Sequence, residues 1–169
     1  MDLQDIKTPG LSCDLHDNPD IKERELALSH KILMSVEKPA RYIGGESGSV
    51  IKDKEKVSVR FAFCFPDSYD IGMSHLGMKI LYSLTNQREA YWCERVFAPG
   101  IDFEEIMRRE NIPLYALESL DPVKDFDFIG FTMQYELSYT NVLNMLDLAG
   151  LPVFAKDRGD ELFNIVVAG

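Results

Sequence analysis

The feature that most constrains the fold of this chain is an alternation of strand-like and helix-like segments that begins at Val57. In residues 57–65, large apolar side chains occupy every second position and alternate with small or polar ones. This pattern is typical of a strand in a buried sheet, and Pro66 ends it. Further strands are predicted at residues 91–97, 113–117, 126–132 and 163–168, with helices between them. The alternation favours right-handed crossovers and predicts an α/β fold with a doubly wound parallel sheet.

Capping signals predict where the helices begin and end. Starts are predicted at Ser74, at Asp102 (with Glu105 in a capping-box pattern) and at Ser138, and Gly150 is predicted to end the last helix. The first of these helices carries Leu76, Ile80 and Leu84 on one face, which is expected to be its packing face.

Composition excludes several classes of protein. The 169 residues suffice for one domain, and 18 basic against 28 acidic residues give a net charge of −10, which disfavours nucleic acid as a partner. Cys13, Cys64 and Cys93 lack the C-x-x-C spacing that a zinc knuckle or an iron–sulfur cluster needs. The acidic start is unlike a signal peptide, and no apolar run approaches the ~20 residues of a membrane span. We therefore expect a cytoplasmic protein without a membrane partner.

The chain divides into three parts. Residues 1–30 are predicted to be a tail or loose N-terminal arm, although helical spacing begins near residue 21. Residues 31–56 hold a helix and a Gly-rich connecting loop, and residues 57–169 form the α/β domain. This domain is expected to be incomplete, truncated before its last helix and strand, and the chain to be a fragment of a longer protein. Its last strand would then leave apolar surface uncovered, which predicts marginal stability or self-association.

Ligands of open parallel sheets bind at the carboxyl ends of the strands. Three predicted loops meet at that edge, namely residues 66–77, residues 132–139 and the segment that begins at residue 168. They are rich in glycine, amide, hydroxyl and methionine groups, a mixture that suits a large, amide-decorated organic ligand better than a bare phosphate. The chain has no G-x-G-x-x-G after a predicted strand, no P-loop, no nucleophile elbow and no H-E-x-x-H motif.

Several ionisable residues in these loops have two interpretations each. His75 is either a metal ligand or acid/base group, or a helix-start residue hydrogen-bonded to the backbone. Asp67 and Asp70 either work as an acid and base pair or stabilise a turn. Glu136 is either catalytic or placed favourably at the start of a helix.

Four strings of residues, at 38–46, 65–77, 94–99 and 129–141, carry a family resemblance. Together they resemble the N-terminal, cobalamin-binding-like region of a family of largely uncharacterised bacterial radical S-adenosylmethionine proteins. The resemblance covers residues 31–169. It implies a Rossmann-like domain that holds a corrinoid over the edge of the sheet, next to a barrel that carries a [4Fe–4S] cluster and cleaves S-adenosylmethionine.

The resemblance also implies roles for individual residues. The nucleotide tail of cobalamin would lie against Gly130, Thr132, Gln134 and Gly169, and the corrin ring would face Tyr69, Gly72, Met73, His75 and Tyr135. His75 is the candidate cobalt ligand, but Met73 and Met78 replace the Asp and Gly of the D-x-H-x-x-G pattern around it. The lower face of the cobalt is then free or meets an uncharged side chain.

The family's cysteine triad lies beyond this chain, so the cluster and S-adenosylmethionine are expected in an absent C-terminal part. This chain would be a cofactor-binding module without catalysis of its own, with the corrinoid and the barrel as partners. The alternative is a scaffold or docking domain that has lost its corrinoid. A receiver-like signalling domain is a third hypothesis, which Asp67 and Asp70 fit loosely, although the lysine expected after a fifth strand is missing.

Overall fold

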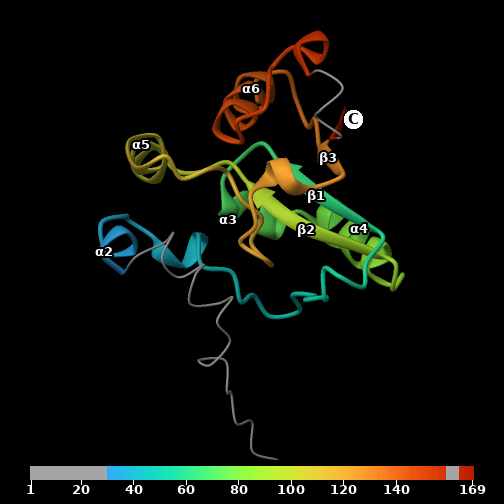
Figure 1. Cartoon of the computed structure of the whole chain (residues 1–169). Coiled ribbons are helices and arrows are strands. Elements are labelled where there is room, and N and C mark those ends of the chain that lie inside the picture. Colours follow the sequence, from blue (N-terminus) through green and yellow to red (C-terminus); the bar gives the residue numbers. More distant parts are fainter. Residues whose placement is uncertain (1–29, 159–163) are drawn as a thin grey trace, which may run out of the picture.

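A four-stranded, fully parallel sheet forms the centre of the fold (Figure 1), which we describe from a computed structural model. The structure describes residues 30–158 and 164–169, so the predicted tail before residue 30 and the start of the last predicted strand lie outside the described residues. The strands are β1 (Val59–Phe65), β2 (Tyr91–Phe97), β3 (Phe128–Phe131) and β4 (Ile165–Ala168), in the spatial order β2-β1-β3-β4. The predicted α/β fold with a Rossmann-like parallel sheet is confirmed.

Helices connect the strands on both sides of this sheet (Figure 1). They are α2 (His30–Leu33) before the sheet, α3 (Tyr69–Ser74) and α4 (Leu76–Asn86) after β1, α5 (Ile101–Glu110) after β2 and α6 (Ser138–Leu148) after β3. Short 3-10 turns occur at Pro39–Arg41, Val123–Asp125 and Ala155–Asp157. Because β2 and β3 flank β1, right-handed crossovers send the chain in opposite directions and place α4 and the pair α5 and α6 on opposite faces.

The predicted start of α4 is wrong by one residue, and its predicted packing face is wrong. Ser74 ends α3, and His75 caps α4 by accepting the backbone N–H of Met78 at its Nδ1, 3.2 Å away. Leu76, Ile80 and Leu84 share one face, but they are 69%, 49% and 54% exposed. The buried face carries Met78, Tyr82 and Asn86 instead. Asn86 bonds the backbone of Cys93 in β2 through both ends of its amide, which fixes this face against the sheet.

The other two predicted caps are also wrong. Gly100 precedes α5, and the carboxylate of Asp102 accepts the backbone N–H of Glu37 at 2.7 Å, which ties α5 to the segment before the sheet. Ser138 is the first residue of α6, and Leu137 precedes it without a side-chain cap. The predicted end of α6 is confirmed, because Gly150 adopts the positive φ of +69° that ends many helices.

Two of the predicted strands are shorter in the structure or are not formed. Residues 113–117 form a single bridge between Tyr115 and Pro122 instead of a strand. The chain reverses there at Leu120, whose φ is +59°, and Ala116 donates to the carbonyl of Asp121 across the turn. The strand predicted at 91–97 is confirmed over its full length, whereas that predicted at 126–132 is limited to β3.

A buried ion pair joins the two longest strands to the loop at residues 118–121. Arg60 of β1 donates to Glu94 of β2 over 2.6 Å, and the side chain of Glu94 is fully buried. Ser119 donates its backbone N–H to the other oxygen of Glu94, and Asp121 lies 2.9 Å from Arg60. The Arg60 guanidinium also lies 4.2 Å from the centroid of the Phe126 ring. Both carboxylate oxygens of Glu94 are therefore hydrogen-bonded, as a buried charge requires.

The last strand has an uncovered face, as predicted. Ile165 and Val167 of β4 point to one side of the sheet, and their side chains are 50% and 49% exposed. Self-association through this face stays a prediction. Within the described part of the chain, no helix is long and apolar enough to cross a bilayer.

We expect Glu94→Gln to lower the free energy of unfolding by about 3 kcal/mol, because it leaves Arg60 buried without its main counter-charge. Asp121 still faces Arg60, which keeps the loss at the lower end of the range for broken buried pairs. Urea denaturation measures this. The matched control is Glu104→Gln on the partly exposed α5 surface, where Arg108 is the partner and a loss under about 1 kcal/mol is expected. Equal losses in the two variants would contradict a buried network at Glu94.

Candidate functional site

The carboxyl ends of the four strands meet at one edge of the sheet, which we call the carboxyl rim (residues 66–68, 98–100, 132–136 and 169). Hydrogen bonds between neighbouring loops hold it together. Ala98 donates to the carbonyl of Asp67, Thr132 to that of Cys64 and Met133 to that of Gly169, over 2.8 to 3.1 Å. The three loops that the sequence analysis placed at this edge do lie side by side.

The strand order reverses between β1 and β3, so the loops that follow these two strands leave in opposite directions. Such a switch point is where open α/β sheets bind their ligands. Two contacts bridge the loops beneath it. Asn141 of α6 donates its side-chain amide to the carbonyl of Pro66 at 2.8 Å, and the hydroxyl of Tyr135 donates to the Asp67 carboxylate at 3.4 Å. Asp67 also accepts the backbone N–H of Ser68 at 2.6 Å, an arrangement consistent with the turn-stabilising interpretation.

Thr132 is the residue at this switch point with an unsatisfied polar group. Its backbone is paired, but its hydroxyl is buried and has no hydrogen-bond partner among the residues that the structure describes. A buried hydroxyl without a partner costs about 1–3 kcal/mol. A ligand group that accepted or donated a hydrogen bond there would recover part of that cost.

Exposed apolar side chains occur in the segments that follow β1 and β3. Ile71, Leu76, Tyr135 and Leu137 are 53%, 69%, 47% and 78% exposed. Exposed apolar side chains near the ligand-binding edge of a sheet are available to a ligand or another protein for docking. Gln134 and Glu136 are also exposed there and add polar groups.

The nine residues predicted to bind the cofactor do not all lie at this point. Thr132, Gln134 and Tyr135 lie in the loop after β3 at the switch point, and Gly169 follows the neighbouring strand β4 and accepts the backbone N–H of Met133. Tyr69 lines a cavity beside β2, and Gly72 and Met73 line a second cavity on the α4 side. Gly130 lies in the middle of β3 and is buried.

Two of these glycines are required for packing. A Cβ at Gly130 would meet the ring of Phe61 at 2.6 Å, and one at Gly72 would collide with the ring of Phe97. Contacts this close force neighbouring groups to move. The space that a side chain would fill at these two positions is thus already occupied by aromatic rings.

His75 has a structural role in this arrangement. Its Nδ1 caps α4, and its ring lies 5.3 Å from that of Phe65. The Nδ1 atom must be unprotonated to accept this bond, so a metal could be reached through Nε2 alone. Cobalt ligation by His75 stays a prediction.

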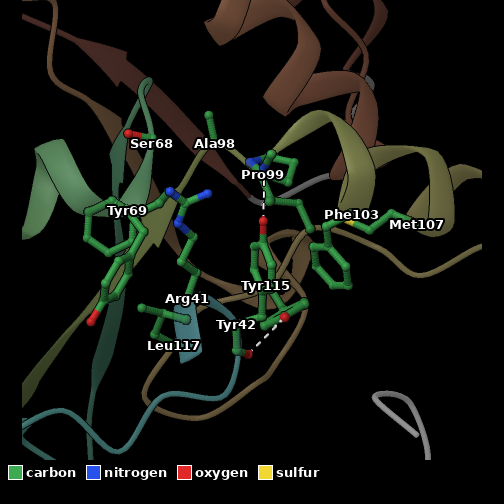
Figure 2. Close-up of a pocket in the computed structure, with 13 residues that line it drawn as sticks. Arg41, Tyr42, Ser68, Tyr69, Ala98, Pro99, Phe103, Met107, Tyr115 and Leu117 are labelled. Carbon is green, nitrogen blue, oxygen red and sulfur yellow. Dashed lines mark hydrogen bonds between the residues drawn. The ribbon is translucent and has the colours of Figure 1, made fainter. Parts of the chain in front are cut away.

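The cavity beside β2 contains residues that the sequence analysis missed (Figure 2). Its volume of about 30 Å³ is the size of one water molecule. Tyr115 donates to the carbonyl of Tyr42 at 2.9 Å, and the Tyr42 hydroxyl accepts the backbone N–H of Gly100. Arg41 enters from the Gly-rich segment and pairs with Asp70 of α3. Arg41 belongs to the string at residues 38–46 that carries the family resemblance, and this membership was the feature of the sequence that could have identified it as a site residue.

The two described cysteines do not fit an iron–sulfur cluster. Cys64 and Cys93 are buried, and burial raises the pKa of both thiols well above the ordinary value, whereas a cluster is held by thiolates. In residues 30–158 and 164–169, no three His, Cys, Asp or Glu side chains lie close enough together to hold a metal ion. We therefore derive no cluster chemistry from these residues.

We expect iodoacetamide to leave Cys64 and Cys93 unmodified in the folded chain and to alkylate both in urea, because burial denies access and suppresses the thiolate. Peptide mass spectrometry at matched reaction times measures this for each cysteine separately. Rapid alkylation of either residue without denaturant would show that the sheet is open there.

Tyr69 gives the site a pH dependence. Burial, together with the Glu46 carboxylate that accepts its hydroxyl, raises the pKa of Tyr69 from 10.0 to about 12. Its contribution to stability is therefore complete below pH 10 and is lost as the pH rises from 10 to 12. We expect the free energy of unfolding of Tyr69→Phe, measured by urea titration, to fall less between pH 10 and pH 12 than that of the wild type. The exposed Tyr139, changed to Phe, is the control, and equal slopes in both variants would contradict the assignment.

The chain matches a family model described as "Radical SAM proteins, N-terminal" over residues 77–169. No curated protein and no solved structure matches it significantly. The match covers β2, β3, β4 and the helices between them, more than half of the chain, and includes the loop after β3 at the switch point. The chain therefore belongs to the radical SAM proteins, as part of their N-terminal region.

Proposed function

We propose that this chain is the corrinoid-binding module of a radical SAM protein, and that the corrinoid lies over the carboxyl rim between β1 and β3. Radical SAM proteins use S-adenosylmethionine and a [4Fe–4S] cluster, and the cysteines described above do not fit that cluster. In this proposal the cluster and S-adenosylmethionine are bound by a barrel domain, which is the partner of this module in the same polypeptide or as a separate chain.

The observation that carries the proposal is the unpartnered hydroxyl of Thr132. It lies at the end of β3, next to the point where the strand order reverses. Burial of this hydroxyl without a hydrogen-bond partner lowers the stability of the ligand-free protein. A polar ligand group that bonded the hydroxyl would recover part of this loss. The side-chain amide of Gln134 and the hydroxyl of Tyr135 lie in the same loop and can bond the amides at the edge of a corrinoid.

The exposed apolar side chains after β1 and β3 support the same proposal. The faces of a corrin macrocycle are broad and apolar, and Ile71, Leu76 and Leu137 are exposed apolar residues in the segments that follow β1 and β3. A bound corrinoid would supply a cobalt centre able to carry an alkyl group to the neighbouring barrel. This chain's residues would bind and orient it, and His75 would continue to cap α4 unless its ring turned away from Met78.

The test is to mix the chain with hydroxocobalamin, desalt it and record the visible absorbance. We expect about one corrinoid per chain, and a 3- to 10-fold weaker affinity for Thr132→Val, which removes the hydroxyl but keeps the shape. The same variant should be as stable as the wild type or more stable, because it removes an unsatisfied buried group. The matched control is Thr140→Val, because the exposed Thr140 hydroxyl donates to the carbonyl of Leu137, the residue that precedes α6.

A second candidate function is a docking domain that binds the barrel without a corrinoid. The exposure of Leu76 and Leu137 favours it, because a protein surface would cover them as well as a corrin ring would. Failure of the folded chain to retain hydroxocobalamin would contradict the first proposal and favour this one. Equal retention of hydroxocobalamin by Thr132→Val and the wild type would show that the Thr132 hydroxyl does not contact the corrinoid.

A further inference from the structure

A second cavity, of about 460 Å³, lies on the α4 side of β2 and is separate from the switch point. We call it the Arg95 cavity. The Gly-rich segment at residues 47–50 forms one wall, Lys79 and Ser83 of α4 form the other, and Met73 of α3 and Arg95 of β2 lie between them. Its volume is within the range of about 300–1,000 Å³ that is typical of small-molecule sites.

The Arg95 side chain is 8% exposed and is held at three of its nitrogen atoms. Its Nε donates to Glu118 at 2.6 Å, and its Nη2 donates to the hydroxyl of Ser49 at 2.8 Å. Its Nη1 donates to the thioether sulfur of Met73, 3.3 Å away. A thioether is a weak acceptor, so an oxygen anion in the cavity would be a better partner for this cationic donor.

Glu118 does not cancel this preference. One of its oxygens accepts from the Arg95 side chain and the other accepts the backbone N–H of the same residue, at 2.7 Å. The pair is neutral as a whole, so the ammonium of Lys79 at the mouth makes the cavity positive. This is unusual on a chain with a net charge of −10, whose overall field repels anions.

The rest of the lining is apolar at depth and polar at the mouth. Tyr82 lies under the Arg95 guanidinium with its ring centroid 4.5 Å from the central carbon, and Met73 and Met78 add adaptable apolar surface. At the mouth, Lys79, Ser83 and Gln87 follow one another at four-residue spacing on α4. Such a lining fits a ligand with an apolar body and an acidic head group.

We propose that the Arg95 cavity binds a small organic anion, a carboxylate or a phosphate ester on an apolar body, whose head group contacts Nη1 of Arg95 and the ammonium of Lys79. This site is separate from the switch point, because Thr132, Gln134 and Tyr135 do not line it, although Gly72 and Met73, which the resemblance predicted to face the corrin, do. Loss of either site therefore leaves the other testable.

The test is calorimetric titration of the full 169-residue chain with benzoate and with phenyl phosphate, with benzyl alcohol as the uncharged analogue. Trp92, the only tryptophan, gives a second signal, because its indole N–H donates to the carbonyl of Val50 in the cavity wall at 2.9 Å. We expect saturable binding of one anion per chain with a change in tryptophan fluorescence, and no such binding of benzyl alcohol. Preference for one of the two anions identifies the head group.

Variants that leave Arg95 in place make the test specific. Lys79→Gln is expected to weaken binding about 2- to 5-fold, because it removes a partly solvated charge. Ser83→Phe is expected to abolish binding by blocking the mouth. The controls are Lys124→Gln, which makes the same change in net charge outside the cavity, and Ile80→Phe, which adds bulk to an exposed face of α4. Thermal melts verify that every variant is folded.

Three results would overturn the proposal. One is the lack of saturable binding of either anion up to about 10 mM, well above the range of weak small-molecule complexes. Another is equal affinity for benzyl alcohol, which would show that the cavity recognises the ring alone. The third is wild-type affinity in a folded Ser83→Phe variant, which would place the bound anion elsewhere.

Discussion

The position of β1 between β2 and β3 is the constraint on which the rest of this structure depends. β1 pairs with β2 over its whole length and with β3 from Phe61 to Cys64, always in parallel. The chain runs from β1 to β2 on one side of β1 and then passes over β1 to β3 on its other side. The two connections therefore run in opposite directions along the sheet. That places helices on both faces and makes the loops after β1 and β3 diverge at the same edge. Thr132 and the exposed apolar side chains lie where they do for this reason.

Buried charge adds a second level of organisation to the apolar core. Glu94 and Arg95 are adjacent in β2, so their side chains point to opposite faces of the sheet. Glu94 meets Arg60 of β1 on one face, and Arg95 meets Glu118 on the other. The loop at residues 118–121 thus closes over the edge of the sheet through ionic contacts on both sides. The first pair serves stability, whereas Arg95 of the second pair also lines a cavity.

Much of the fold was predictable because strands and helices differ in the period of their apolar residues. The apolar period predicted the strand-like and helix-like segments, and their alternation along the chain predicted the parallel arrangement. The caps were not predictable, because the side chains involved have distant partners: Asp102 binds the backbone of Glu37, and the histidine after Ser74 caps α4 in its place. The packing face of α4 was misassigned because it contains Asn86, a polar residue satisfied by the backbone of Cys93.

The candidate site was predictable only in part. That the loops after β1, β3 and β4 meet follows from topology. That Arg41 reaches Asp70, or that the side chain of Arg95 lies under the Gly-rich segment, depends on contacts across 29 and 46 residues that no local pattern encodes. The predicted cofactor residues accordingly divide among the carboxyl rim, two cavities, the interior of β3 (Gly130) and the cap of α4 (His75).

The central claim is that a corrinoid binds at the switch point, and hydrogen–deuterium exchange with and without hydroxocobalamin tests it most directly. The claim predicts slower exchange in peptides that cover residues 66–77 and 132–139, where the loops diverge, and unchanged exchange in α5. Protection confined to other segments, or the same exchange in both samples, would contradict it.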